Sequence, residues 1–293
     1  MELILGSAQF ADSYGISNNK SFISKKDLKK IFSISKKKFF IDTAYTYKGS
    51  LETIKQYNYK YKFKINLKID IGSNKDYQKK FFERINYCFY TLDVKKIYCI
   101  MIHDTKNFIK LSKNEKNKIL NKLGYLKKIG KIKKIGFSIY DKEEITFLKK
   151  VQNINIVQIP LNIFDQSLLY NKELLLLKNR DIEIHARSIF LQGLVFVKFS
   201  KIEKIVGKKI NKIKLFYKKF PTIEERLYHC INFIKNCEIL DKTIIGFTDY
   251  KEFKKLNDIF NKKKTITDYK PYAIMDKKIL RPYFWKITNT SFK

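Results

Sequence analysis

The sequence has few of the residues that mark several common kinds of protein. Its 293 residues include four prolines, ten glycines and four cysteines. The cysteines (Cys88, Cys99, Cys230 and Cys237) lack a C-x-x-C spacing, and their positions are too irregular for a disulfide framework. We therefore expect four reduced, buried thiols. No cluster of His, Cys or Asp has the spacing of metal ligands, and we predict no metal site.

Long apolar segments are also missing. No run approaches the about 20 residues that a membrane-spanning helix needs, and the N-terminus lacks a basic segment followed by a long apolar region. The hydrophobic content of 44% and the charged content of 31% are typical of a soluble globular protein. We therefore predict a cytoplasmic protein without a membrane partner.

Arginine is scarce, although the chain is strongly basic. The formal net charge is +34, but only five of the 62 basic residues are arginines. Lysines can displace counterions from phosphates, so nucleic-acid or polyanion binding is one hypothesis. Arginine, however, is preferred for bidentate contacts to phosphates and bases, and the lysines are spread over nearly every predicted helix. We expect solvated lysine surfaces and no nucleic-acid partner.

Short apolar strands alternate with amphipathic helices along most of the chain. The predicted strands cover 3–8, 39–42, 63–69, 96–102, 134–137, 156–159, 182–186 and 243–245. The first predicted helix follows Ser24, and the others cover 50–57, 76–90, 112–129, 141–151, 171–179, 202–219, 222–236 and 250–261. Strands that alternate with helices indicate a parallel sheet, and eight such units favour an α/β fold of the closed (β/α)₈ type, the TIM barrel.

A doubly wound open sheet is the alternative for this pattern. That fold usually carries a glycine-rich first turn, and the chain contains neither G-x-G-x-x-G nor G-x-x-x-x-G-K-[ST]. No internal repeat, linker or low-complexity segment divides the chain. We predict one domain over 1–293, with a barrel core over about 3–260 and a tail over 265–293 that packs on or near the barrel mouth.

Four reactive side chains lie at or just past the ends of neighbouring predicted strands. Asp42 ends the second strand, and Tyr47 lies five residues later. Lys68 is near the end of the third strand, and His103 ends the fourth. In such a barrel the active site lies at the carboxyl ends of the strands, so these groups should meet at one mouth.

This group predicts a proton donor beside an oxygen that gains negative charge. The Lys68 ammonium would make the Tyr47 phenol a stronger acid. Asp42 would keep Lys68 charged and oriented. His103 could hydrogen-bond a substrate carbonyl.

At these positions the chain resembles the aldo-keto reductase family. The resemblance covers roughly residues 3–260 in order, which is more specific than any single motif. The matching segments are LGSAQF (5–10), YGI (14–16), IDTAYTY (41–47), LK (67–68), IHD (102–104), GKIKKIGFSIYD (130–141), VQIPLNIFDQ (157–166), IHARSIFLQG (184–193) and IIGF (244–247). The chain looks closest to bacterial members that carry IHARSxFLQG.

The resemblance implies a barrel that binds a nicotinamide cofactor without a Rossmann unit and reduces an aldehyde or ketone. A sugar or a small metabolite would be the substrate. The family's catalytic tetrad matches Asp42, Tyr47, Lys68 and His103. Tyr47 would be the general acid. The positions that match the cofactor site are Gly6, Ser7, Ser138, Gln158, Arg187, Ser188 and Gly246. We expect the substrate pocket to be lined by Phe10, Tyr45, Phe190 and the tail around Trp285.

Some positions depart from the family pattern. Arg187 stands where many relatives place an aromatic ring on the nicotinamide, and Ile139 stands where an asparagine often follows the serine. Residues 246–249 lack the lysine-serine pair that many relatives use for the adenosine 2′-phosphate, although Lys251 or Lys254 could replace it. We expect NADPH as the cofactor, with NADH as the alternative. The departures also motivate a second hypothesis, a catalytically weakened barrel that works as a binding or accessory protein.

Overall fold

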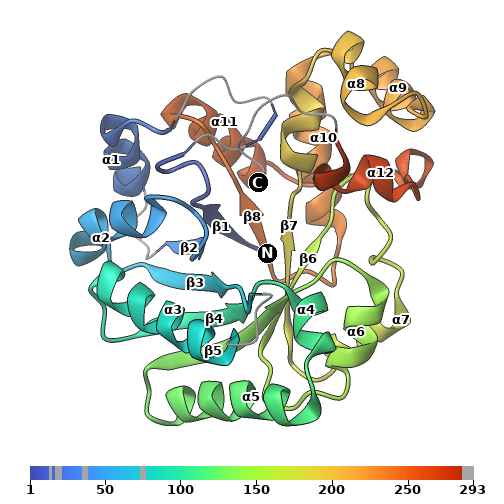
Figure 1. The fold of residues 1–293 in the computed structure, drawn as a ribbon. Helices are drawn as coiled ribbons and strands as arrows, with labels where there is room; N and C mark the ends of the chain where they lie inside the picture. The colour runs from blue at the N-terminus through green and yellow to red at the C-terminus, as the bar shows by residue number, and fades with distance from the viewer. Residues whose placement is uncertain (13–14, 17–21, 35–38, 73–76, 286–293) are drawn as a thin grey trace.

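The computed structural model is a closed barrel of eight parallel strands with helices around its outside (Figure 1). Each strand pairs with the next, and β8 pairs with β1. The strands are β1 (Glu2–Gly6), β2 (Phe40–Ala44), β3 (Lys64–Ile69), β4 (Ile97–Ile102), β5 (Ile132–Ser138), β6 (Ile156–Pro160), β7 (Glu183–Arg187) and β8 (Lys242–Ile245). The predicted (β/α)₈ barrel is confirmed, and the open-sheet alternative is wrong.

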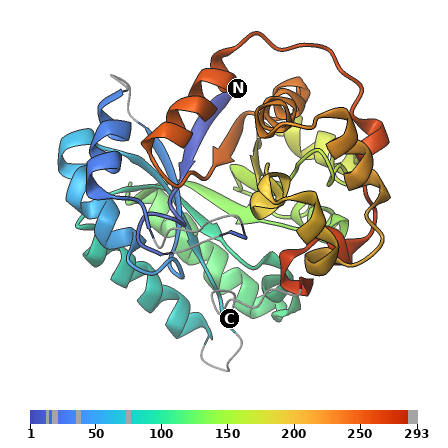
Figure 2. The ribbon, with the colours of Figure 1, turned by 90° about the horizontal axis from the view of Figure 1, so that it is seen from above.

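The structure describes residues 1–12, 15–16, 22–34, 39–72 and 77–285. Tyr14, most of the loop between 12 and 20, the first residue of the helix predicted at 76, and the tail beyond 285 lie outside these residues. In Figure 2 the red C-terminal segment lies beside the gold helices α8 and α9, on the side of the barrel opposite the blue α1 and α2, whereas the orange-red α11 lies next to α1.

Eleven helices of the described chain cover the barrel or its loops. They are α1 (Lys25–Ile34), α2 (Ser50–Tyr61), α3 (Tyr77–Leu92), α4 (Thr105–Lys110), α5 (Lys113–Lys128), α6 (Lys142–Leu148), α7 (Lys172–Lys178), α8 (Phe199–Val206), α9 (Asn211–Lys219), α10 (Ile223–Asn236) and α11 (Tyr250–Asn261). Shorter helical segments follow β7 and form the tail: η1 (Leu191–Phe196), η2 (Lys270–Tyr272), α12 (Lys277–Leu280) and η3 (Pro282–Phe284).

The helix predicted over 202–219 is two helices. Gly207 ends α8 with a φ of 90°, a conformation that favours glycine, and its N–H donates to the Glu203 carbonyl. The chain therefore turns before α9 begins. Helix α4 was not predicted, although Asp104 caps it by accepting a hydrogen bond of 3.0 Å from the Asn107 N–H.

Strand residues alternate between the barrel interior and the layer beneath the helices. On β4, Ile100 and Ile102 belong to the large core that packs under the helices. Cys99 and Met101 form a separate cluster with Ile156 of β6. This alternation follows from the period of two in a strand, and it brings every second side chain of each strand to the interior below the mouth.

The described tail packs on the loops that follow β5 and β6. The Ile274 N–H donates to the Phe164 carbonyl at 2.8 Å. The Arg281 side chain is 2% exposed, and its guanidinium donates to the Asp165 carboxylate at 2.6 Å and to the Tyr140 carbonyl at 3.0 Å. Because these loops follow the carboxyl ends of strands, the tail is fixed beside the barrel mouth.

We expect Arg281→Lys to lower the free energy of unfolding by about 1–3 kcal/mol. Lysine keeps the charge near Asp165 but lacks the planar group that reaches Tyr140 at the same time. Urea denaturation measures the change. Arg180→Lys is the matched control, because exposed Arg180 also donates to two backbone carbonyls, and it should change stability by less than about 0.5 kcal/mol. Equal losses in the two variants would contradict the anchoring role.

All four cysteines are free and buried, as the sequence indicates. Burial raises the pKa of Cys88 and of Cys237 to about 12. Burial also holds the pKa of Cys99 and of Cys230 well above the usual range of a thiol. No helix in the described part of the chain is long and apolar enough to cross a membrane.

Candidate active site

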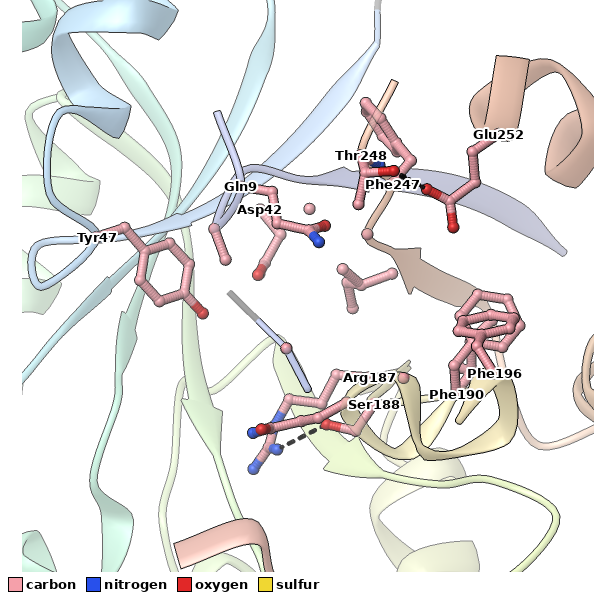
Figure 3. Close-up of a pocket in the computed structure, with 18 of the residues that line it drawn as sticks. Gln9, Asp42, Tyr47, Arg187, Ser188, Phe190, Phe196, Phe247, Thr248 and Glu252 are labelled. Atoms are coloured by element: carbon pink, nitrogen blue, oxygen red, sulfur yellow. Dashed lines mark hydrogen bonds between the residues drawn. The ribbon is translucent and has the colours of Figure 1, made fainter. Parts of the chain in front are cut away.

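A pocket opens at the carboxyl ends of the strands, where side chains from several strands and loops converge (Figure 3). The predicted site residues that line it are Gly6, Asp42, Tyr47, Lys68, His103, Arg187, Ser188, Phe190 and Gly246. The four residues proposed for catalysis therefore share one cavity, as their positions at strand ends predict.

A buried ion pair forms the bottom of this pocket. The Lys68 ammonium of β3 lies 2.5 Å from Oδ2 of Asp42 on β2. The Gln158 amide of β6 donates to the other carboxylate oxygen, Oδ1, at 2.8 Å. Since β2 and β6 are not neighbours, this bond crosses the barrel interior. Both charged side chains are at most 4% exposed, and each compensates for the burial of the other.

The ion pair keeps Lys68 charged. Burial lowers the pKa of Lys68, but the charge of Asp42, the nearby Tyr47 and the hydrogen bond to Asp42 outweigh burial, so the pKa lies above its usual value of 10.5. The Nζ atom lies 5.2 Å from the centre of the Tyr47 ring. An ammonium group is thus fixed beside the phenol at neutral pH.

A tight loop after β2 places Tyr47 in the pocket. The Tyr47 N–H donates to the Ala44 carbonyl, and the Tyr47 carbonyl accepts from the Ser50 N–H, each at 3.1 Å. Gly49 has a φ of 66°, and a Cβ there would lie 2.7 Å from the Cβ of Ala11, so the loop requires glycine. In Figure 3 the Tyr47 hydroxyl points into the cavity.

His103 is held by a carboxylate that sequence reasoning missed. Its Nδ1 atom lies 2.9 Å from Oδ1 of Asp70, the residue directly after β3, and the two rings of His103 and Tyr47 meet edge-on at 6.5 Å. Burial raises the pKa of Asp70. The contact with His103 and the charge of Arg84 outweigh burial, so the pKa of Asp70 lies below its usual value. A negative Asp70 favours the proton on Nδ1, which leaves Nε2 for another partner. The sequence feature that could have identified Asp70 is its position as a carboxylate directly after a predicted strand.

Arg187 stacks on an aromatic ring beside the pocket. Its guanidinium carbon lies 4.1 Å from the centre of the Tyr140 ring, and Nη2 donates to the Ile139 carbonyl at 3.0 Å. Nη1 lies 3.5 Å from the Ser188 hydroxyl, the bond dashed in Figure 3. The guanidinium of Arg281 lies 5.5 Å from the same ring. Tyr140, which was not predicted, therefore joins the tail to the pocket.

Three aromatic residues expected in the substrate pocket pack elsewhere. Phe10 packs against a phenylalanine of α1 and another after β8. Tyr45 meets a tyrosine of α3 edge-on, with ring centres 5.8 Å apart. The Trp285 ring N–H donates to a carbonyl of α12 at 2.9 Å. Each ring finds its contacts locally, so none of the three lines the cavity, whereas Phe190 does.

Three residues assigned to the cofactor site by the resemblance lie outside the cavity lining. The Ser7 hydroxyl is bonded to the Ser50 hydroxyl at 2.7 Å, and the Gln158 amide is engaged by Asp42. Ser138 pairs with Gln158 across β5 and β6 and is 1% exposed. Its hydroxyl has no hydrogen-bond partner among the described residues, which makes it a buried polar group available to a ligand.

The other end of the pocket is formed by residues that the sequence did not single out. Glu252 of α11 accepts hydrogen bonds from the backbone N–H and the hydroxyl of Thr248, at 2.7 and 2.6 Å. Phe196 and Phe247 complete this end, and Gln9 lines the pocket beside Asp42 (Figure 3). The spacing of Thr248, Asp249 and Glu252 at the start of α11 is a helix-capping pattern, and that was the only signal available.

The comparisons with known proteins agree with the observed fold. The model of the Aldo/keto reductase family matches residues 2–268. The holo form of the aldo-keto reductase AKR11C1 from Bacillus halodurans has a TM-score of 0.70 and 13% identity, over 92% of this chain and 90% of that chain. MGS-M4, an aldo-keto reductase from a Medee basin deep-sea metagenome library, has a TM-score of 0.60 and 18% identity, over 99% of this chain and 93% of that chain.

At these identities the solved structures are evidence for the fold alone. No curated protein matches the chain at a significant level. The family match, in contrast, spans nearly the whole sequence. The chain therefore belongs to the aldo/keto reductase family, whose members are oxidoreductases of carbonyl compounds.

Proposed function

We propose that the protein reduces an aldehyde or ketone to an alcohol with a nicotinamide dinucleotide as cofactor, and that Tyr47 is the general acid. The observation that carries this proposal is the buried ion pair of Asp42 and Lys68 beside the Tyr47 phenol. When bound, the cofactor would supply the hydride. A sugar or a small metabolite carbonyl is the substrate that we propose.

The residues of the pocket have separate roles in this proposal. Tyr47 gives its proton to the carbonyl oxygen, and the Lys68 ammonium stabilises the phenolate that remains. Asp42 keeps Lys68 charged and fixed in place. When both of its ring nitrogens carry protons, His103 donates from Nδ1 to Asp70 and from Nε2 to the same oxygen, and so aligns the carbonyl with Tyr47.

The residues beside the tetrad fit a nicotinamide group. The buried Ser138 hydroxyl can bond a carboxamide, and Gln158 can join it by exchanging its bond with Asp42. Gly6 and Gly246 line the pocket without side chains, which leaves room for a ligand. A Cβ on Gly246 would lie 2.9 Å from Oε1 of Gln9, so a larger residue would displace that side chain into the cavity. Arg187, held over the Tyr140 ring, presents a planar group for stacking.

We expect the purified protein to bind a reduced nicotinamide dinucleotide and to oxidise it when a suitable carbonyl compound is added. Cofactor fluorescence during titration measures binding. The loss of cofactor absorbance with a panel of aldoses, ketoses and small aldehydes measures turnover. A protein that neither binds a dinucleotide nor oxidises it with any member of the panel would contradict the proposal.

A second candidate function is a barrel that binds small molecules without efficient catalysis. The observation that favours it is the engagement of Arg187 by Tyr140 and Ile139, where many relatives place an aromatic ring. This candidate predicts no turnover with the carbonyl panel and no measurable affinity for the dinucleotide. A micromolar dissociation constant would contradict it.

We also propose that residues 1–293 form one domain and that the protein works in the cytoplasm. The tail is tied to the loops after β5 and β6 through Arg281, which supports a single folded unit. Four free, buried thiols suit a reducing compartment. Small carbonyl compounds, rather than nucleic acids, are the partners that we propose for the pocket.

A further inference from the structure

We infer that the pocket selects NADH over NADPH, and that Glu252 is the residue that makes the selection. The inference rests on the proposed binding of a nicotinamide dinucleotide and names which of the two dinucleotides binds. It differs from the sequence-based expectation of NADPH. Three features of the described residues carry it.

The first feature is the layout of the cavity. Tyr47 and Glu252 line the same pocket and lie at opposite ends of it (Figure 3). The barrel interior below Tyr47 is filled by the bonded side chains of Asp42, Lys68 and Gln158. A dinucleotide whose nicotinamide lies beside Tyr47 must therefore extend along the pocket. Its adenosine half then reaches the end at Glu252.

The second feature is the charge at that end. Both hydrogen bonds from Thr248 go to Oε2 of Glu252, which leaves Oε1 to accept from a ribose hydroxyl. A carboxylate that accepts from the 2′-hydroxyl is the arrangement by which many proteins bind NAD. NADPH carries a 2′-phosphate there, with a charge of about −2, and a fixed carboxylate repels it.

The start of α11 does not cancel this repulsion. A helix N-terminus carries about half a positive charge and exposes N–H groups that bind phosphates. Here the chain's own carboxylates already occupy the start of the helix. Asp249 accepts from the Glu252 N–H at 2.9 Å, and Glu252 accepts from the Thr248 N–H. Two negative side chains outweigh the partial charge of the helix.

The third feature is the position of the cations. Among the described lining residues, the basic side chains are Lys68, Arg187 and His103, and Figure 3 shows Arg187 on the side of Tyr47, away from Glu252. Lys251 and Lys254, which could have served a 2′-phosphate, line a different hollow between α10 and α11. The structure therefore places neither of these two lysines at the end of the pocket where the phosphate would lie.

The test is equilibrium binding of NADH and of NADPH, followed by cofactor fluorescence and by calorimetry, without substrate. The wild type should bind NADH about tenfold more tightly than NADPH at low salt, and the ratio should shrink as added salt screens the repulsion. Glu252→Gln keeps the shape of the side chain and should tighten NADPH about tenfold, with NADH changed less than about threefold. Replacement of Lys251 and Lys254 by alanine should change neither constant.

Glu225→Gln is the matched control. Glu225 accepts from the N–H and the hydroxyl of Thr222 at the start of α10, as Glu252 does from Thr248, but it lies outside the pocket. It should show the same small loss of thermal stability as Glu252→Gln and no change in either dissociation constant. Tighter binding of NADPH by the wild type, or an unchanged ratio in Glu252→Gln, would overturn the inference and leave the proposed function standing. Binding of neither dinucleotide would overturn both.

Discussion

The Tyr47→Phe variant should reduce kcat by about 10²–10⁴-fold, because the loss of the phenol removes the proton donor for the carbonyl oxygen. The ring itself remains, and with it the contacts to Lys68 and His103 that position the loop. The dissociation constant of the dinucleotide should therefore change by less than about threefold. Steady-state kinetics and fluorescence titration of the same preparation separate the two effects.

Two other tyrosines provide controls for this variant. Tyr45→Phe changes a phenol of the same loop whose ring packs against α3, outside the pocket, and it should leave kcat unchanged. Tyr140→Phe changes a phenol that lines the pocket but keeps the ring on which Arg187 stacks. Its kcat should fall much less than that of Tyr47→Phe. Normal turnover in Tyr47→Phe would refute the assignment of the general acid.

The Lys68→Met variant should lose about 3–5 kcal/mol of unfolding free energy at neutral pH, because it leaves the Asp42 carboxylate buried without its cation. In the wild type the pKa of Lys68 is raised, so the contribution of the pair is complete below the unfolded value of 10.5 and is lost only as the pH rises through the folded value. Urea denaturation from neutral to alkaline pH measures both effects.

A double variant distinguishes a buried charge from simple loss of packing. Asp42→Asn combined with Lys68→Met removes both charges, while an amide remains in the position that Gln158 bonds. It should recover most of the stability that Lys68→Met loses, and neither variant should reduce carbonyls. If Lys68→Met were as stable as the wild type, the pair could not be buried and charged as the structure has it.

The sequence predicted the barrel well because its strands are short apolar runs between amphipathic helices. Each predicted strand boundary lies within two residues of the observed one. Strands that are covered on both faces are read directly from hydrophobicity. The break at Gly207 was missed because the apolar periodicity continues across it, and periodicity carries no information on the φ of one residue.

The sequence places site residues most directly where they lie at or just past the ends of strands. Strand ends share one edge of the barrel, so Asp42, Lys68 and His103 had to lie near one another. Loop residues have no such constraint. Tyr45 turned toward α3, although it is only two residues from Tyr47. Glu252 came to the pocket through a helix cap, a feature that sequence reasoning usually assigns to stability alone.

The four buried thiols of the folded chain should react slowly with thiol reagents, which leaves an introduced cysteine as the reactive one. Thiol reagents attack through the thiolate, and each native cysteine is enclosed and strongly disfavours that form. A single cysteine introduced at an exposed position such as Lys254 would then take up a fluorophore selectively, on the helix that carries Glu252. Labelling of the four native cysteines would instead report local or global unfolding, because a reagent reaches each buried thiol only when the structure around it opens.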